Sequence, residues 1–138
     1  DGTCPMAGKH IELAKTYGCY CWFINHETEV FEEQPLYPEH AQNMQEFIEY
    51  MKSQAPELRV IYYDSMTSEG NMDWQNALTD KNSMFLSDEE GNAVADEMFL
   101  NFWWTEDELA SEELIKASAK KAEELGLDPY QVFAGVDI

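Results

Sequence analysis

Short stretches rich in aromatic and β-branched residues recur along the chain at a nearly constant interval. Four of them have the length and composition of buried strands, and they begin 34 to 38 residues apart: Trp22–Asn25, Val60–Tyr63, Met98–Phe102 and Val132–Val136. The segments between them carry apolar residues at helical spacing. The pattern therefore predicts a repeating unit of one strand and one helix.

Helix-ending residues bound the first predicted helices. One helix covers about Met6 to Tyr17 and stops at Gly18, and a second covers about Pro38 to Ala55, before Pro56. The apolar stripe of a third runs from about Met72 to Phe85.

The last predicted helix has the clearest boundaries. It begins at a capping box, in which Thr105 is followed three residues later by Glu108. It ends at Gly126, a C′ candidate that precedes Asp128 and Pro129.

Strict alternation of strands and helices favours parallel strands joined by right-handed crossovers, so the fold class is α/β. Periodicity leaves an open doubly wound sheet and a (β/α)8 TIM barrel as alternatives. A closed barrel needs about 250 residues, whereas the 138 residues of this chain hold about four βα units. If the fold is a barrel, the chain is a partial barrel, a single segment spanning 1–138.

The charge balance excludes some partners. The chain has 28 acidic and 8 basic residues, a net charge of −20, whereas nucleic acids and anionic lipids are bound by clustered basic residues. No apolar run approaches the roughly 18 residues of a membrane span. We therefore expect a soluble polypeptide with no nucleic-acid partner and no membrane insertion.

The three cysteines are odd in number and do not form a disulfide framework. Cys19 and Cys21 could join Cys4, His10 or His26 around a metal ion. A free cysteine more often packs as a small hydrophobic residue. We therefore favour buried or half-buried free thiols, and expect neither a metal nor another cofactor.

Polar and aromatic side chains gather where the predicted strands end. Asn25 and Glu27 follow the first strand, Tyr63 ends the second, and Asn101 lies in the third with Trp104 just beyond it. Taken singly, a carboxylate just after a strand is more often a helix cap than a catalytic group. A tryptophan at such a position more often packs in the core or between layers than it binds a ligand. In parallel α/β folds the strand ends converge on one edge, and this combination suits a sugar, because aromatic faces stack on pyranose rings while amides and carboxyls bind hydroxyls.

The spacing of Asn25 and Glu27 favours one type of glycoside hydrolysis. By strand alternation, both side chains project to the same side. Most glycosidases use two carboxyl groups, but in substrate-assisted enzymes the 2-acetamido oxygen of the substrate replaces the nucleophile. That route needs a group that orients the acetamide and an acid/base at the glycosidic oxygen, which an amide and a carboxyl could supply.

Five motifs in register resemble glycoside hydrolase family 85, the endo-β-N-acetylglucosaminidases that cut the chitobiose core of N-glycans. They are Trp22–Thr28 (W-F-I-N-x-E-T in the family), Tyr63–Met66 (Y-D-S-M), Trp74–Asn76 with Asn82 and Phe85 (W-Q-N…N…F), Phe99–Trp104 (F-x-N-Y-x-W) and Val132–Asp137 (V-Y-A-G-I-D). Two positions depart from the pattern: Cys21 stands where the family usually has glycine, and Phe102 replaces a tyrosine and so lacks its hydroxyl.

The resemblance implies a role for each candidate residue. Asn25 would hold the acetamido group, Glu27 would act as general acid and then base, and Tyr63 would support the oxazolinium step. Trp74 and Trp104 would line the glycan groove, with Asn101 as a further pocket residue.

The resemblance also implies a (β/α)8 barrel that retains the anomeric configuration and needs no metal. N-glycans of glycoproteins or free oligosaccharides would be the substrates, and the remaining barrel strands of the full-length protein would complete the domain. The compartment stays open, because the family includes exported bacterial enzymes, the favoured type here, and cytosolic eukaryotic ones.

Two other classes of function compete with a hydrolase. A partial barrel could serve as a non-catalytic carbohydrate-binding or interaction module, and the isolated segment could be inactive. A small acidic signalling domain with Asp64 as phosphoacceptor would also need a lysine near the last strand, and none lies near Val132–Asp137.

Overall fold

A computed structural model describes residues 4–27, 38–103 and 111–138, in which strands and helices alternate except between the second and third strands. The elements in chain order are α1 (Pro5–Tyr17), β1 (Cys21–Ile24), α2 (Pro38–Gln54), β2 (Arg59–Tyr63), the 3₁₀ turn η1 (Ser83–Phe85), β3 (Glu97–Phe99), α3 (Ser111–Glu124), the 3₁₀ turn η3 (Pro129–Gln131) and β4 (Val132–Phe133).

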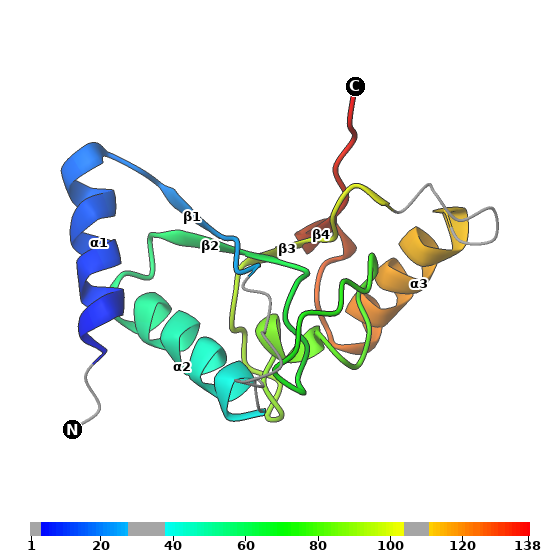
Figure 1. The fold of residues 1–138 in the computed structure, drawn as a ribbon, viewed down its shortest axis with the longest axis horizontal. Coiled ribbons are helices and arrows are strands. Elements are labelled where there is room, and N and C mark those ends of the chain that lie inside the picture. Colours follow the sequence, from blue (N-terminus) through cyan, green and yellow to red (C-terminus); the bar gives the residue numbers. More distant parts are fainter. Residues whose placement is uncertain (1–3, 28–37, 104–110) are drawn as a thin grey trace.

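The four strands form one parallel sheet in the order β1-β2-β3-β4. One row of paired residues crosses the whole sheet, from Ile24 through Tyr62 and Met98 to Val132. Figure 1 shows α1, α2 and α3 following one side of the curved sheet. The predicted α/β class with parallel strands is confirmed.

Strand alternation gives the sheet two different faces. The face toward the helices is the hydrophobic core, in which Val60, Tyr62 and Met98 are fully buried. The opposite face carries an aromatic layer whose neighbouring ring centroids are 5.2–6.0 Å apart: Phe23, Tyr63, Phe99, Phe102 and Phe133. Phe23, Phe102 and Phe133 are more than a third exposed. One member of this aromatic layer, Tyr63, is the last residue of β2 and therefore lies at the edge where the strands end.

The predicted helix ends agree with the structure where it describes them. Helix α1 ends at Gly18, whose φ of 69° is the left-handed conformation of a helix cap. Helix α2 begins at Pro38 and stops before Pro56, and Gly126 follows α3 with a φ of 73°. The predicted capping box of Thr105 and Glu108 lies outside the described residues.

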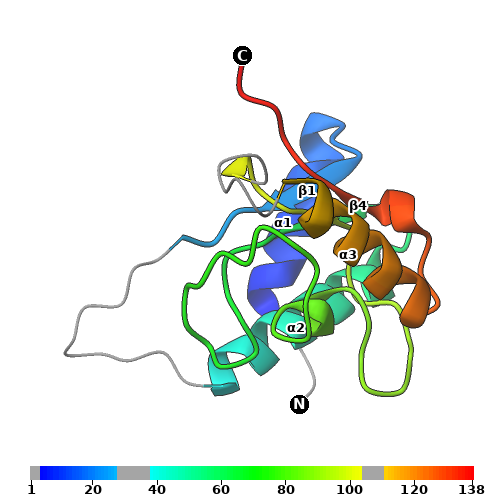
Figure 2. The same ribbon diagram turned by 90° about the vertical axis from the view of Figure 1, so that its right-hand side faces the viewer.

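The predicted helix from Met72 to Phe85 is wrong. The segment is a loop that contains only the short η1 turn, and Figure 2 shows the chain after β2 looping back beside α2. Partners from elsewhere bind its backbone: Asn76 N–H donates to Asp64 at 2.6 Å and Leu78 N–H donates to Ser118 at 2.9 Å. Polar side chains that bind backbone groups compete with helix formation.

The last two strands are shorter than predicted. Strand β3 ends at Phe99 rather than Phe102, and β4 ends at Phe133 rather than Val136. Asn101 has a φ of 84°, which takes the chain out of the extended conformation. Hydrogen bonds between the two segments nevertheless continue beyond the strands, including Gly135 N–H to the Asn101 carbonyl at 3.0 Å.

Replacing Gly135 with alanine should destabilise the protein by about 1–3 kcal/mol. A Cβ at Gly135 would lie 2.5 Å from Phe102 and 2.8 Å from Phe99, so the aromatic layer would have to shift. Gly8 is the matched control, because it is exposed inside α1 with no atom within 4 Å of an added Cβ. Gly8→Ala should raise stability by about 1 kcal/mol. Chemical denaturation of the full-length protein measures both, and equal effects would contradict the packing.

Candidate functional site

Three candidate residues meet where β1 and β2 end. Asn25 and Glu27 follow β1 and are exposed, whereas Tyr63 is the last residue of β2 and is only 7% exposed. Because Ile24 pairs with Tyr62 in the parallel register, the two segments leave the sheet side by side. The first strand thus brings an amide and a carboxylate to the same edge as a phenol.

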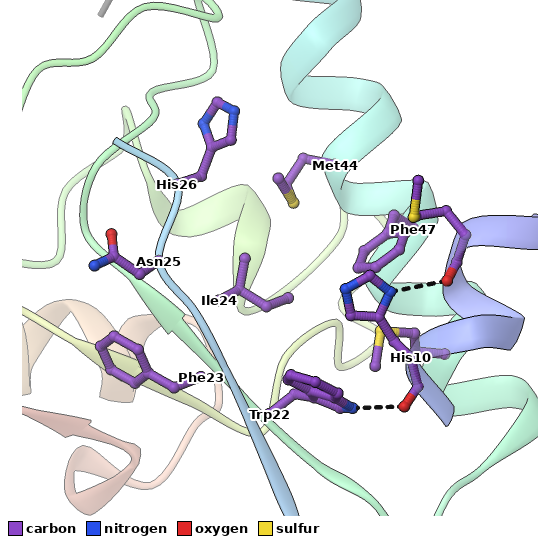
Figure 3. Close-up of a pocket in the computed structure, with 10 residues that line it drawn as sticks. His10, Trp22, Phe23, Ile24, Asn25, His26, Met44 and Phe47 are labelled. Carbon is purple, nitrogen blue, oxygen red and sulfur yellow. Dashed lines mark hydrogen bonds between the residues drawn. The ribbon is translucent and has the colours of Figure 1, made fainter. Parts of the chain in front are cut away.

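The orientation of Asn25 follows the alternation of β1. Figure 3 shows Asn25 and Phe23 on one side of the strand and Trp22 and Ile24 on the side of α1 and α2. Phe23 stacks on the ring of Tyr63, with centroids 6.0 Å apart. Asn25 therefore projects from the face that carries the aromatic layer, not from the face packed against the helices.

Glu27 and Trp74 both lie close enough to Tyr63 to influence its pKa. Burial and then the Glu27 carboxylate, as hydrogen-bond acceptor and as charge, raise the pKa of Tyr63 to about 12, while the Trp74 indole opposes this rise. Tyr63 therefore keeps its proton at neutral pH and is a hydrogen-bond donor beside a carboxylate. The Trp74 indole N–H is buried, and no acceptor among the described residues meets hydrogen-bond geometry with it.

The other predicted binding residues are placed differently. Asn101 is only 4% exposed, and its side-chain oxygen accepts from the Phe102 N–H at 2.7 Å, so this oxygen shapes the chain after β3. Its predicted contact with substrate stays a prediction. Trp104 lies outside the described residues. Phe102, which stands where the family usually has tyrosine, is 44% exposed and packs edge-on against Phe99.

A buried carboxyl that sequence reasoning did not assign to the site lies directly behind it. Asp64 is 1% exposed and accepts hydrogen bonds from Asn76 N–H at 2.6 Å and the Asn82 side chain at 2.8 Å. Its position after Tyr63 at a strand end was the available signal, but its partners lie in a loop that was predicted to be helical. A carboxyl this enclosed is unsuited to phosphorylation, which argues against the signalling alternative.

The Asp64 carboxyl should make the stability of the protein fall as the pH rises. Burial raises its pKa to about 7, and the bonds from Asn82 and Asn76 only partly oppose this. Because the folded state holds this proton more tightly than the unfolded state, the contribution of Asp64 is fully present below about pH 4. It is lost at up to about 1.4 kcal/mol per pH unit as the pH rises toward 7.

Denaturation at pH 5 and pH 7 tests this pH dependence. The loss of unfolding free energy between the two values should be smaller in Asp64→Asn than in the unchanged protein, because asparagine does not titrate. An identical loss in both proteins would contradict the raised pKa.

A cavity on the helix side of β1 reaches the edge that carries the candidate site. It has a volume of about 420 Å³ and lies mainly between α1, β1 and α2 (Figure 3), with an apolar lining that includes Trp22, Met44 and Phe47. The Trp22 indole is bound to the His10 carbonyl at 3.0 Å. Most of its lining belongs to the packing between the helices and β1, but Asn25 and His26 also line it where β1 ends, whereas Glu27 and Tyr63 do not.

The cysteines are free thiols. Cys4 and Cys21 are half-buried as expected, but Cys19 is exposed, which corrects the expectation for that residue. Across the described ranges, no three His, Cys, Asp or Glu side chains are grouped in a way that could hold a metal ion. Within the same ranges, no helix has the length and apolar character required to cross a membrane.

Similarity to known proteins covers the whole chain. The profile of Glycosyl hydrolase family 85 matches residues 1–138. Cytosolic endo-beta-N-acetylglucosaminidase 2 of Arabidopsis thaliana is 32% identical over 131 residues, which are 92% of this chain and 16% of that protein. Cytosolic endo-beta-N-acetylglucosaminidase of Danio rerio is 33% identical over 107 residues, which are 75% of this chain and 13% of that protein.

A solved structure supports the same relationship. The glycoside hydrolase domain of Endo-D from Streptococcus pneumoniae R6 matches 98% of this chain with a TM-score of 0.75 and 32% sequence identity, and this chain covers 20% of it. The matching domain is a (β/α)8 barrel, so the four parallel strands and their helices correspond to part of such a barrel rather than to an open doubly wound sheet. The chain belongs to glycoside hydrolase family 85.

Proposed function

We propose that the full-length protein is an endo-β-N-acetylglucosaminidase that hydrolyses the GlcNAc-β-1,4-GlcNAc bond in the chitobiose core of N-glycans. Residues 1–138 are then a single segment of its catalytic barrel. One observation carries the proposal: the neutral Tyr63 hydroxyl lies beside the Glu27 carboxylate and the Trp74 indole, at the strand edge that also carries Asn25. The names of the relatives support the same activity.

The first chemical step forms an oxazolinium ion within the substrate. Asn25 holds the 2-acetamido group so that its carbonyl oxygen attacks the anomeric carbon. The bond from that carbon to the glycosidic oxygen breaks, and Glu27, which enters this step as the carboxylic acid, donates its proton to the departing oxygen and becomes a carboxylate. Tyr63, which keeps its proton near neutral pH, donates a hydrogen bond in the forming oxazolinium site.

The second step consumes water. Glu27, now a carboxylate, takes a proton from a water molecule whose oxygen attacks the anomeric carbon and opens the oxazolinium ring. Two displacements at the same carbon return the original configuration, so the product keeps the β configuration. Trp74 lines the groove for the glycan, with Trp104 and Asn101 as further predicted contacts.

The rest of the barrel is the expected partner of this segment. Within the described residues, β1 and β4 each pair with a single neighbouring strand, and the aromatic layer includes side chains more than a third exposed. Strands from the remainder of the full-length protein would extend both edges and enclose the aromatic layer. For this reason activity is tested with the full-length protein and not with residues 1–138 alone.

Release of glycan from a high-mannose glycopeptide tests the proposed activity. The full-length protein should leave one GlcNAc on the peptide and release the remaining glycan, which mass spectrometry detects as a single mass difference. Glycan binding without release would instead support a non-catalytic carbohydrate-binding module.

A further inference from the structure

The Asp64 carboxylate organises the loop that follows β2. It accepts hydrogen bonds from the Asn76 N–H and from the Asn82 side chain. Both carboxylate oxygens are therefore bound by donors of one loop. Enclosed and fully bonded, Asp64 has no oxygen left to meet a substrate.

The partners of Asp64 hold the loop in a conformation that includes a left-handed residue, Asn76. Asn76 has a φ of 52°, in the left-handed region that few side chains adopt. Asn82 is fully buried and also binds the loop itself, donating to the Ala77 carbonyl and accepting from the Thr79 N–H, each at 2.8 Å. These bonds hold residues 76–82 around one carboxyl group.

The loop carries Trp74 to the candidate site. Trp74 immediately precedes Gln75 and Asn76, and its indole lies close enough to Tyr63 to lower the pKa of that phenol. Tyr63 in turn immediately precedes Asp64. A single carboxylate therefore connects the end of the strand that supplies the phenol to the loop that supplies the indole.

We propose that Asp64 is a positioning residue whose bonds to Asn76 and Asn82 keep Trp74 against the Tyr63 hydroxyl. Only the effect on kinetics rests on the proposed function, because it requires Trp74 to contact the glycan. The position of the loop does not depend on whether the protein is an enzyme.

Hydrogen exchange in the full-length protein tests the placement. At about pH 8, above the pKa of about 7, Asp64 is ionised and both oxygens accept. Asp64→Asn keeps the shape of the side chain but replaces one acceptor oxygen with a donor, so at this pH the amides of residues 73–82 should exchange at least about tenfold faster. Asp96→Asn is the matched control: Asp96 accepts from Val60 N–H at 2.7 Å and from Lys52 at 3.0 Å, at the opposite end of the strands. It should leave exchange in residues 73–82 unchanged.

Kinetics then test the route through Trp74. Asp64→Asn should raise KM for the glycopeptide by a larger factor than it lowers kcat, whereas Asp96→Asn should change neither. In a Trp74→Ala background, Asp64→Asn should change kcat/KM by less than about twofold, because interacting residues are not additive. Asn82→Ala removes one donor and should act in the same direction, and it replaces Asp64→Asn if that variant does not fold.

Two results would overturn the inference: unchanged exchange in residues 73–82 of Asp64→Asn, or effects of Asp64→Asn and Trp74→Ala on kcat/KM that simply multiply. If the unchanged protein releases no glycan, the proposed function fails on its own. The exchange measurement still decides whether Asp64 holds the loop.

Discussion

Glu27→Gln in the full-length protein should slow glycan release by about 10²- to 10⁴-fold, the range for a positioned general acid and base. Glutamine keeps the size and the hydrogen-bonding carbonyl of the side chain but can neither donate the proton to the leaving oxygen nor take one from water. Binding of the glycan should therefore stay within about twofold of the unchanged protein. Initial rates on the glycopeptide and calorimetric titration with the glycan give the two numbers.

A second glutamate provides the control for the loss of one negative charge. Glu57 is exposed, and it lies before β2 at the end of the sheet opposite the candidate site. Glu57→Gln should leave both the rate and the glycan affinity unchanged. Full activity in Glu27→Gln would remove Glu27 from the mechanism.

Asn25→Ala should lower kcat by about 10²- to 10³-fold, as expected for removing one preorganised polar group from a developing charge. Without the amide, the acetamido oxygen is not held against the anomeric carbon and the positive oxazolinium loses a partner. The loss should be mainly in kcat, because the proposed contact of Trp74 with the glycan is unchanged. Single-turnover rates with the glycopeptide measure the chemical step directly.

Asn43→Ala provides the control for this substitution. Asn43 is exposed on α2, which covers the helix side of the sheet. The activity of Asn43→Ala should equal that of the unchanged protein. A loss of less than about tenfold in Asn25→Ala would contradict the proposed handling of the acetamido group.

The sequence predicts the strands and the edge of the sheet well because both depend on short local patterns. The apolar runs around Val60 and Met98 are buried as expected, the run around Trp22 is only half-buried, and the parallel order follows from the alternation. Asn25, Glu27 and Tyr63 then reach one edge through strand geometry alone. These features need no knowledge of the loops.

The loop after β2 could not be predicted in the same way. Its apolar residues have helical spacing, but its backbone donors bind Asp64, 12 residues before Asn76, and Ser118, 40 residues after Leu78. Such distant partners leave no periodic signal in the sequence. The position of Trp74 and the importance of Asp64 therefore become visible only when the loop is seen folded.

The anomeric configuration of the first product is the most direct test of the proposed mechanism. Proton NMR of the released glycan, recorded before mutarotation, distinguishes the β from the α form of the new reducing-end GlcNAc. Catalysis by Asn25 and Glu27 through the substrate's own acetamido group predicts that the β form appears first. If the α form appears first, water attacks the anomeric carbon directly and the proposed oxazolinium route is contradicted.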